Sequence, residues 1–411
     1  MPTAHAALAH AAPQLFGAPV DYLFFALTLI GIAVFHKRTL LVAVTGLAVI
    51  LVYQATVSGF PTGFGLAALG RHFGHEWVTL SNLMLLLVGF EVLSNQFERS
   101  NLPDHMPGLL PDNWSGSLVL LAIVFVLSAF LDNIAAAVIG GVMAKHVYKG
   151  RVSVGFLAAI VASANAGGAG SVIGDTTTTM MWLKGVSPLQ VLPAYVAAGT
   201  AFAVFALVAA WSQHRYQPCL RHNEPGHPIL WRRVAIVLVC GVAANVTANI
   251  LTTGEEAAPW LGLAIWAALL ATSLIGKPDW SVIRPAFKGA AFLVSLVAAA
   301  SLMPIQNLPE PSWMTTLGLG FLSSVFDNIP LTALALNQGG YDWALLAYAV
   351  GFGGSMVWFG SSAGVALTTL FPEGRSVYAW LRQGWYVPVA YVAGFFLMLF
   401  VVGWVPTAIG G

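Results

Sequence analysis

Two short polar motifs stand inside long apolar stretches of the sequence. Residues 128–134 read SAFLDNI and residues 323–329 read SSVFDNI, so each stretch carries an Asp-Asn pair. Carboxylate and amide oxygens are the ligands that hard cations prefer. An ionisable residue inside a membrane segment costs about 2.5 to 3.5 kcal/mol on insertion scales, and such residues are functional candidates by default. The candidates in these motifs are Ser128, Asp132, Asn133, Ser323, Asp327 and Asn328.

A glycine-rich run follows each Asp-Asn pair. Residues 165–175 read NAGGAGSVIGD and residues 353–361 read GGSMVWFGS, and in both runs another glycine lies six residues beyond the Gly-Gly pair. Two motifs that recur in the same order indicate an internal duplication. The candidate residues in these runs and directly after them are Asn165, Gly168, Asp175, Thr176, Gly354 and Ser361.

The composition is that of an integral membrane protein. Of 411 residues, 58% are hydrophobic and 8% are charged, with a mean hydropathy of +0.80, whereas soluble domains carry about 25% charged residues. Apolar runs of about 20 residues predict spanning helices and not barrel strands. The net charge of +1 excludes a strong overall positive potential that would attract nucleic acid. The two cysteines offer neither a disulfide framework nor metal-ligand spacing. No cofactor is expected.

Hydropathy predicts ten spanning helices. Their approximate ranges are 22–36, 38–58, 77–97, 152–184, 189–212, 232–251, 257–275, 287–305, 343–371 and 386–405. Two more segments, 115–145 and 312–338, carry the Asp-Asn pairs near their middle. Glycine runs inside 152–184 and 343–371 predict unwound backbone at mid-membrane, which a bilayer tolerates only where it is buried or lines a cavity.

The Lys and Arg residues decide the topology, because cytoplasmic loops collect them. If 115–145 and 312–338 are re-entrant hairpins, all 17 Lys and Arg residues except Arg71 and Lys184 lie on one side of the membrane. If both segments span the membrane, 6 of these residues lie on one side and 11 on the other. We therefore predict hairpins, both termini outside, and a bacterial inner membrane location. The resulting all-α architecture has two inverted repeats, 1–213 and 232–411, joined by a cytoplasmic linker, 214–231.

The motifs resemble those of a known family. Residues 167–179 (GGAGSVIGDTTTT), 327–330 (DNIP) and 353–364 (GGSMVWFGSSAG) are similar to the ion transporter superfamily, and within it to NhaD-type sodium/proton antiporters and related arsenite permeases. The resemblance covers residues 115–371 and implies an elevator-type fold and a homodimer. One departure is the Ala run 135–137, where the family pattern has threonines, so hydroxyl ligands are missing there.

The expected function is exchange of Na⁺ or Li⁺ for H⁺. Burial disfavours the charged form of a carboxylate, so a proton and a cation can compete for one site. The expected Na⁺ ligands are Asp132, Asn133, Asp175, Asp327 and Asn328. One alternative is a sodium-coupled di- or tricarboxylate symporter, although that pattern has Ser-Asn-Thr at the hairpin tips. A second is oxyanion or arsenite export, for which cysteine ligands are absent. An enzyme is disfavoured, because no Ser/His/Asp set or metal cluster is present within the membrane segments.

Each candidate also has a structural interpretation. Asp and Asn at the start of a helix can cap its free N–H groups, which applies to both Asp-Asn pairs and to Asp175 before the threonines 176–179. Glu91 can place its carboxylate at the membrane surface. Histidines in the central linker, such as His214, can be ordinary solvated residues.

Overall fold

Helices make up almost all of the regular structure. The computed structural model describes residues 13–15, 18–35, 38–60, 63–219, 228–236, 240, 258–304, 308–326 and 328–408. Within these ranges the strands are β1 (Gln14–Leu15) and β2 (Ala18–Pro19), which form one short antiparallel pair. The predicted all-helical class is confirmed.

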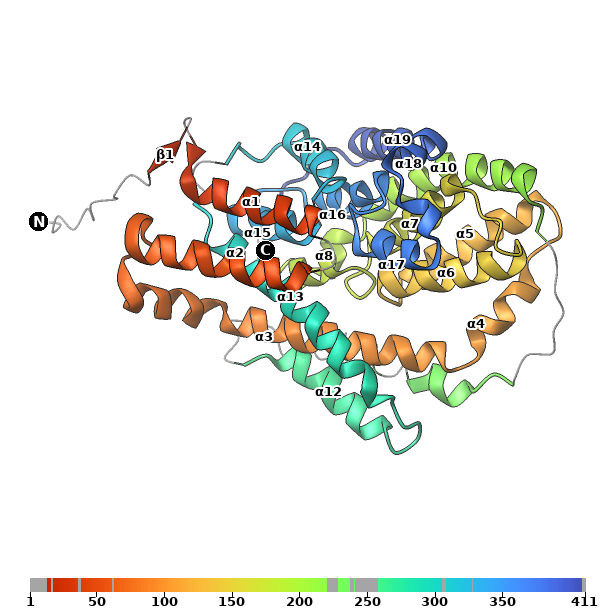
Figure 1. Cartoon of the computed structure of the whole chain (residues 1–411), viewed down its shortest axis with the longest axis horizontal. Helices are drawn as coiled ribbons and strands as arrows, with labels where there is room; N and C mark the ends of the chain where they lie inside the picture. The colour runs from red at the N-terminus through yellow and green to blue at the C-terminus, as the bar shows by residue number, and fades with distance from the viewer. Residues whose placement is uncertain are drawn as a thin grey trace, which may run out of the picture.

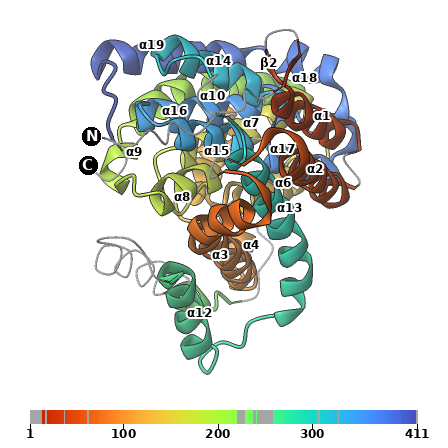
Figure 2. The same ribbon diagram turned by 90° about the vertical axis from the view of Figure 1, so that its left-hand side faces the viewer.

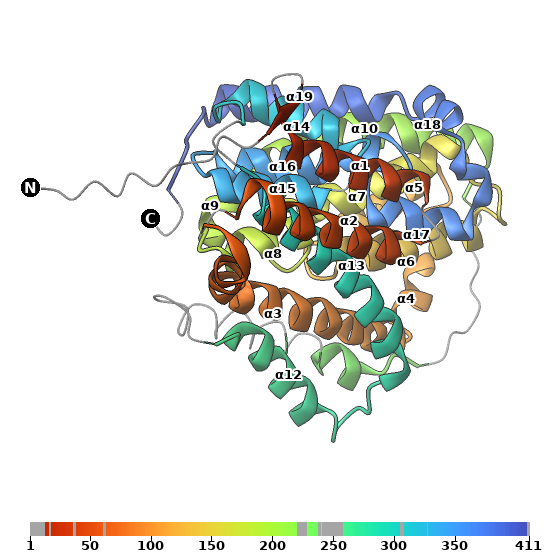
Figure 3. The ribbon, with the colours of Figure 1, turned by 60° about the vertical axis from the view of Figure 1, so that its left-hand side comes forward.

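Five helices form what we call the peripheral group. They are α1 (Val20–Val34), α2 (Thr39–Tyr53, continued by a π-helical turn Gln54–Ser58), α3 (Gly65–Glu98), α12 (Trp260–Thr272) and α13 (Ile283–Ser301). The long helix α3 packs against α12 and α13, and α13 also packs against α2. Figure 3 shows α1 above α2 and α3 below them, with α13 running obliquely from α2 past α3 toward α12 at the bottom.

Ten helices form the central group. They are α5 (Trp114–Ser128), α6 (Asn133–Val147), α7 (Val154–Gly168), α8 (Thr176–Leu183), α10 (Ala194–Tyr216), α14 (Trp313–Ser323), α15 (Asn328–Gln338), α16 (Trp343–Gly353), α17 (Ser362–Leu370) and α19 (Tyr386–Val401). Short helices connect them: α4 (Leu102–His105), α9 (Pro188–Val191) and α18 (Val377–Gln383). Figure 1 shows the central group beside the peripheral one.

Both predicted hairpin segments and both predicted broken helices are interrupted at their motifs. The Asp-Asn pairs separate α5 from α6 and α14 from α15, and the glycine runs separate α7 from α8 and α16 from α17. Helix α5 packs against α6 and α7, and α14 packs against α16. The packing also crosses between the halves of the chain, since α6 contacts α17 and α15 contacts α8.

Helices α7 and α16 form the centre of the molecule. Every residue of both is buried, and Figure 2 places them between α10 and α19 on one side and α3 on the other. Their sequences are rich in Ala and Gly, which lets helix backbones approach closely where lipid supplies no hydrophobic driving force. Both helices end at a glycine run.

Glycine is required where these helices meet the neighbouring hairpins. A Cβ on Gly167 would overlap the carbonyl oxygen of Phe125 in α5, and a Cβ on Gly353 would overlap that of Gly320 in α14. The following glycines allow the chain to fold back on itself: a Cβ on Gly168 or Gly354 would lie 2.7 Å from the carbonyl oxygen six residues later. The same close approaches therefore occur in both halves.

The spans differ from the prediction in number and length. Four described helical stretches are long and apolar enough to cross a membrane, with a fifth if α18 and α19, bent by 60°, are joined, whereas ten were predicted. The two broken helices each consist of shorter pieces, α1 has only 15 residues, and most of 232–251 lies outside the described residues. Helix α3 begins at Gly65 and not near 77, because Arg71, His72 and Glu76 lower the local hydropathy without ending the helix.

Replacing either close-contact glycine should destabilise the protein. Gly167→Ala or Gly353→Ala forces a methyl group onto a backbone carbonyl, and overpacking of this kind costs about 1 to 3 kcal/mol. Thermal unfolding in detergent measures the change. Gly199→Ala in α10 is the matched control, since nothing lies within 4 Å of its Cβ position. Equal melting temperatures for all three variants would contradict the packing described here.

Thiol labelling tests the predicted topology. Arg99, Lys149 and Leu189 are exposed, and the native Cys219 and Cys240 are buried and can be replaced by Ser. We expect cysteines at 99 and 149 to react with an impermeant reagent from one side, and a cysteine at 189 from the other, because basic loops stay cytoplasmic. Reaction of 99 and 149 from opposite sides would exclude a re-entrant first hairpin.

Candidate ion-binding site

A chain of buried hydrogen bonds starts at the first Asp-Asn pair. Asn133, the first residue of α6, donates from Nδ2 to Asn165 Oδ1 and to Asp175 Oδ1, each at 3.2 Å. Asn165 lies near the end of α7, and Asp175 directly precedes α8. The tip of the first hairpin is thereby joined to both sides of the first helix break.

The second half of the chain joins this network through Asn165. Its Nδ2 donates to Ser355 Oγ at 2.9 Å and to Ser361 Oγ at 3.2 Å. Ser355 belongs to the 3₁₀ turn Gly354–Met356, and Ser361 directly precedes α17. One amide side chain therefore connects the two helix breaks.

All five side chains of this network are shielded from solvent. Exposed fractions are 5% for Asn133, 0% for Asn165, 1% for Asp175, 0% for Ser355 and 2% for Ser361. Buried polar groups are stable only when they are hydrogen-bonded, and in a low-dielectric interior such networks are rigid and highly specific. The network can therefore hold a carboxylate at a defined position.

Asp175 and Ser361 occupy equivalent positions but behave differently. Ser361 accepts a hydrogen bond from the backbone N–H of Gly364 at 3.3 Å and so caps α17. Asp175 makes no side-chain capping bond to α8 and instead accepts from Asn133. Ser361 therefore acts as a helix cap, whereas the capping interpretation of Asp175 is wrong.

Threonine side chains fix the loop before α8. Thr178 Oγ1 donates to the carbonyl oxygens of Ser171 (2.5 Å) and Asp175 (2.9 Å). Thr179 Oγ1 donates to those of Val172 (2.8 Å) and Asp175 (2.9 Å). These hydroxyls hold the backbone that positions the Asp175 carboxylate. Thr176, the remaining threonine candidate, starts α8 and is partly exposed.

The Asp175 carboxylate lies beside the backbone of the second half at Gly351. A Cβ on Gly351 in α16 would lie 3.0 Å from Asp175 Oδ2. Counting back from the Gly-Gly pairs, Gly351 is the equivalent of Asn165. The carboxylate of one half thus faces a glycine of the other, while the amide of the first half faces Ser361.

Asp132 lies at the tip of the first hairpin, directly before α6. It is partly exposed and forms no ion pair with another described residue. The acidic side chains whose charges act on it are Glu91, on the peripheral helix α3, and Asp175. Negative charge on either neighbour disfavours the charged form of Asp132 and so favours binding of a proton or a cation there.

Hydroxyl groups distinguish the two halves further. Ser323 Oγ donates to the carbonyl oxygen of Val350 at 2.6 Å, whereas the buried Ser128 Oγ has no hydrogen-bond partner among the described residues. The same holds, within the described part of the chain, for the buried Ser163 Oγ and Thr177 Oγ1, also in the first half. The first half therefore contains buried hydroxyl oxygens near its helix break that are available to bind a cation.

The remaining candidates lie at the corresponding places of the second half. Asn328 begins α15, is 5% exposed, and accepts from Thr332 through its backbone oxygen. Gly354 begins the 3₁₀ turn that contains Ser355. Asp327 lies outside the described residues.

Sequence reasoning missed four residues here. Ser355, Ser163 and Thr177 lie within the motifs or on the helices beside them, but nothing in their spacing separates them from structural hydroxyls. Glu91 was interpreted as a residue reaching toward the membrane surface. Its place in the last third of an apolar helix, still within the predicted span 77–97, was the available signal.

A cavity of about 310 Å³ reaches the hairpin tips. It is bounded by Ile134 beside Asn133, by Phe326 before Asp327, and by Ser362 beside Ser361. Leu29 and Phe292 close it on the peripheral side. No Lys or Arg stands among the described residues that line it, so they present no cationic side chain to the cavity.

Comparison with known proteins gives the family. Residues 22–353 match the citrate transporter family CitMHS. The chain belongs to this family. The matched range runs from α1 to the end of α16 and includes both Asp-Asn pairs. The resemblance to the ion transporter superfamily is thus confirmed, and the apolar helices fit an integral membrane protein.

The chain is also similar to sodium/proton antiporters of plants and bacteria. It is 28% identical to sodium/proton antiporter 1 of Arabidopsis thaliana over 59% of this chain and 48% of the plant protein, so it spans about half the length of that relative. It is 24% identical to the Na(+)/H(+) antiporter NhaD of Vibrio parahaemolyticus over 71% of this chain and 83% of that protein. It is 23% identical to the Na(+)/H(+) antiporter NhaD of Alkalimonas amylolytica over 78% of this chain and 76% of that protein.

The different hydrogen bonds of Ser361 and Asp175 predict different effects on stability. Ser361→Ala removes a helix cap and should cost about 0.5 to 2 kcal/mol. Asp175→Asn keeps an oxygen that accepts from Asn133 and removes a buried charge, so the free energy of unfolding should stay equal or rise. Thermal unfolding of both purified variants makes the comparison. A larger loss for Asp175→Asn would restore the capping interpretation.

Proposed function

We propose that this protein exchanges Na⁺ or Li⁺ for H⁺ by alternating access. The observation that carries the proposal is the buried Asp175 carboxylate at the junction of the two helix breaks, bonded to Asn133. The sodium/proton antiporter names of the relatives support it. Asp132, Asp175 and Asp327 are the proposed exchange carboxylates.

The competition of two ions for one set of oxygens explains the exchange. Burying a carboxylate costs free energy of desolvation, and either a bound proton or a bound metal cation lowers that cost. The amides of Asn133 and Asn165 are neutral, so their oxygens can complete a coordination shell without adding a second charge. The hydroxyls of Ser128, Ser163 and Thr177 can serve in the same way.

The same proposal includes the arrangement in the membrane. Two inverted repeats, 1–213 and 232–411, would each contribute a re-entrant hairpin and a broken helix, and the matching glycine contacts of Gly167 and Gly353 support this duplication. The central group would then move against the peripheral group in an elevator-type homodimer. Both termini would lie outside, in a bacterial inner membrane.

The second candidate is a sodium-coupled di- or tricarboxylate symporter. The family match favours it. Two features speak against it: the wall of the 310 Å³ cavity presents no Lys or Arg among its described residues, and both hairpin tips carry Asp. A citrate-like polyanion would meet negative charge at the site and no cationic side chain along the cavity.

Flux in proteoliposomes decides between the two candidates. A pH dye inside the vesicles reports proton movement after addition of Na⁺, Li⁺, K⁺ or citrate in turn. Exchange predicts a response to Na⁺ and Li⁺ without citrate. Proton movement that requires citrate would establish the symporter instead.

Substituting the carboxylates should abolish exchange without unfolding the protein. We expect Asp132→Asn, Asp175→Asn and Asp327→Asn each to reduce Na⁺-driven proton flux at least about a hundredfold, because an amide can hold neither ion by charge. The apparent affinity of the wild-type protein for Na⁺ should fall as the pH falls, because protons occupy the same oxygens.

A matched control separates the site from charge in general. Asp279→Asn removes an exposed carboxylate that pairs with Arg99 at 3.2 Å, and it should leave flux unchanged. Yield and monodispersity of each variant are measured first. Normal exchange by one of the three site variants would rule that residue out as an essential carrier.

A further inference from the structure

Two short helices run side by side away from the site. Helix α8 starts directly after Asp175, and α15 starts at Asn328. The two helices belong to different halves of the chain and pack against each other. At 1.5 Å per residue, α8 is about 12 Å long. A displacement at the site is therefore carried to its far end as a rigid-body movement.

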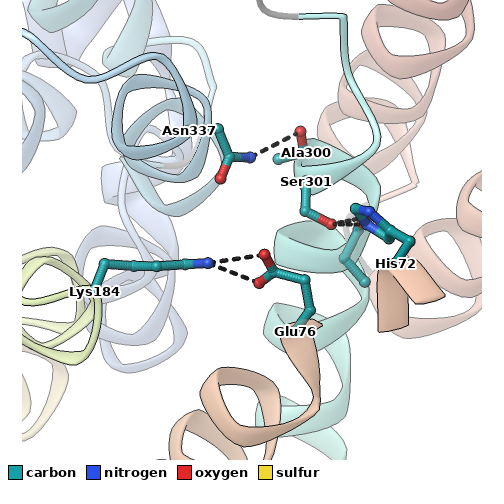
Figure 4. Close-up of polar contacts among 7 residues, drawn as sticks. His72, Glu76, Lys184, Ala300, Ser301 and Asn337 are labelled. Carbon is teal, nitrogen blue, oxygen red and sulfur yellow. Dashed lines mark hydrogen bonds and ion pairs between the residues drawn. The ribbon is translucent and has the colours of Figure 1, made fainter. Parts of the chain in front are cut away.

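The far ends of both helices are tied to the peripheral group. Lys184, directly after α8, places Nζ 2.9 and 2.8 Å from the two carboxylate oxygens of Glu76 in α3. Asn337 of α15 donates to the carbonyl oxygen of Ala300 in α13 at 3.4 Å. Figure 4 shows the Lys184 and Asn337 side chains reaching across from the central group to Glu76 and Ala300.

The peripheral side of this contact is itself held in place. His72, one helical turn before Glu76, forms a 3.0 Å hydrogen bond with Ser301 Oγ at the end of α13, and Figure 4 shows this bond beside the ion pair. Helices α3 and α13 are thus hydrogen-bonded to each other close to the points where Lys184 and Asn337 contact them. The ion pair connects two bodies that are each internally bonded.

The interface between the central and peripheral groups is tightly packed at Glu76 and Lys184 and contains a larger cavity at the hairpin tips. The space between Glu76, Lys184, Ser301 and Asn337 amounts to about 10 Å³, no more than one water molecule needs. The cavity at the hairpin tips, between the same two groups of helices, has about 310 Å³. The site therefore has room on one side and a tight, charge-paired contact on the other.

We propose that the Glu76–Lys184 ion pair is a latch, which must open each time the site is exposed toward the far ends of α8 and α15. The proposal rests on the alternating access proposed above. Side-chain exposures are 25% for Lys184 and 15% for Glu76. Separating two partly buried charges requires water around each of them, so the latch favours the closed arrangement until the crevice is hydrated.

Labelling of a cysteine in the crevice measures the opening of the latch directly. Thr79 lines the closed space, so Thr79→Cys in a background without native cysteines reports access from that side. Glu76→Gln and Lys184→Met should each raise the labelling rate about tenfold. The charge exchange Glu76→Lys with Lys184→Glu should restore it toward the parent rate.

A second ion pair supplies the control. Arg99 and Asp279 pair at 3.2 Å, but both residues lie within the peripheral part of the chain, at the end of α3 and before α13. Asp279→Asn should leave the labelling rate at position 79 unchanged. If Glu76→Gln behaves like Asp279→Asn, or if the charge exchange fails to restore the rate, the latch is ruled out.

Cross-linking tests whether the latch must open during transport. Glu76→Cys and Lys184→Cys are joined by a short bis-methanethiosulfonate reagent, which a reducing agent removes. We expect Na⁺-driven proton flux to stop on cross-linking and to return on reduction. Full flux in the cross-linked protein would overturn the latch and leave the proposed exchange intact.

The two proposals fail separately. If the wild-type protein moves no protons with Na⁺ or Li⁺, the proposed exchange is wrong. The labelling rates at position 79 require no transport, so they still decide whether the Glu76–Lys184 pair closes the crevice.

Discussion

The carboxylate of Asp175, buried between the two halves of the chain, constrains everything around it. A charged group that is 1% exposed is tolerated only with polar partners at fixed positions. Asn133 brings the first hairpin to it, and Asn165 ties that contact to the break in the second half. Gly351 allows α16 to come close, and the glycines at the ends of α7 and α16 allow the hairpins to reach the same place.

In these contacts the two halves of the chain contribute different side chains to one site. The first half contributes the carboxylate, the amide that holds it, and three buried hydroxyls that have no hydrogen-bond partner among the described residues. The second half contributes Ser361, which caps a helix, and Ser323, whose hydroxyl donates to a carbonyl oxygen. The two halves thus make matching glycine contacts with different side chains around them, and the described side chains of the second half have mainly structural tasks at the junction.

Features encoded locally could be predicted from the sequence. The breaks at the glycine runs were predicted because Gly disfavours helix wherever it occurs, and the interruptions at the Asp-Asn pairs were predicted because hairpins there place most Lys and Arg on one side. The start of α3 was missed, because the charge of Glu76 is compensated by Lys184, more than one hundred residues away. The separate roles of Asp175 and Ser361 also depend on distant partners. Periodicity and hydropathy contain no information on either contact.

The hydrogen bond between Asn165 and Ser361 joins residues 196 positions apart, and this separation sets an order of events during biosynthesis. When the first half has been inserted into the membrane, Asp132 and Asp175 are already there, but Ser355 and the backbone of Gly351 are not. The polar tip of the first hairpin must therefore wait in the bilayer, or at its surface, until nearly the whole chain has been made. Slow pairing of this kind is the cost of a site assembled from both ends of a polypeptide.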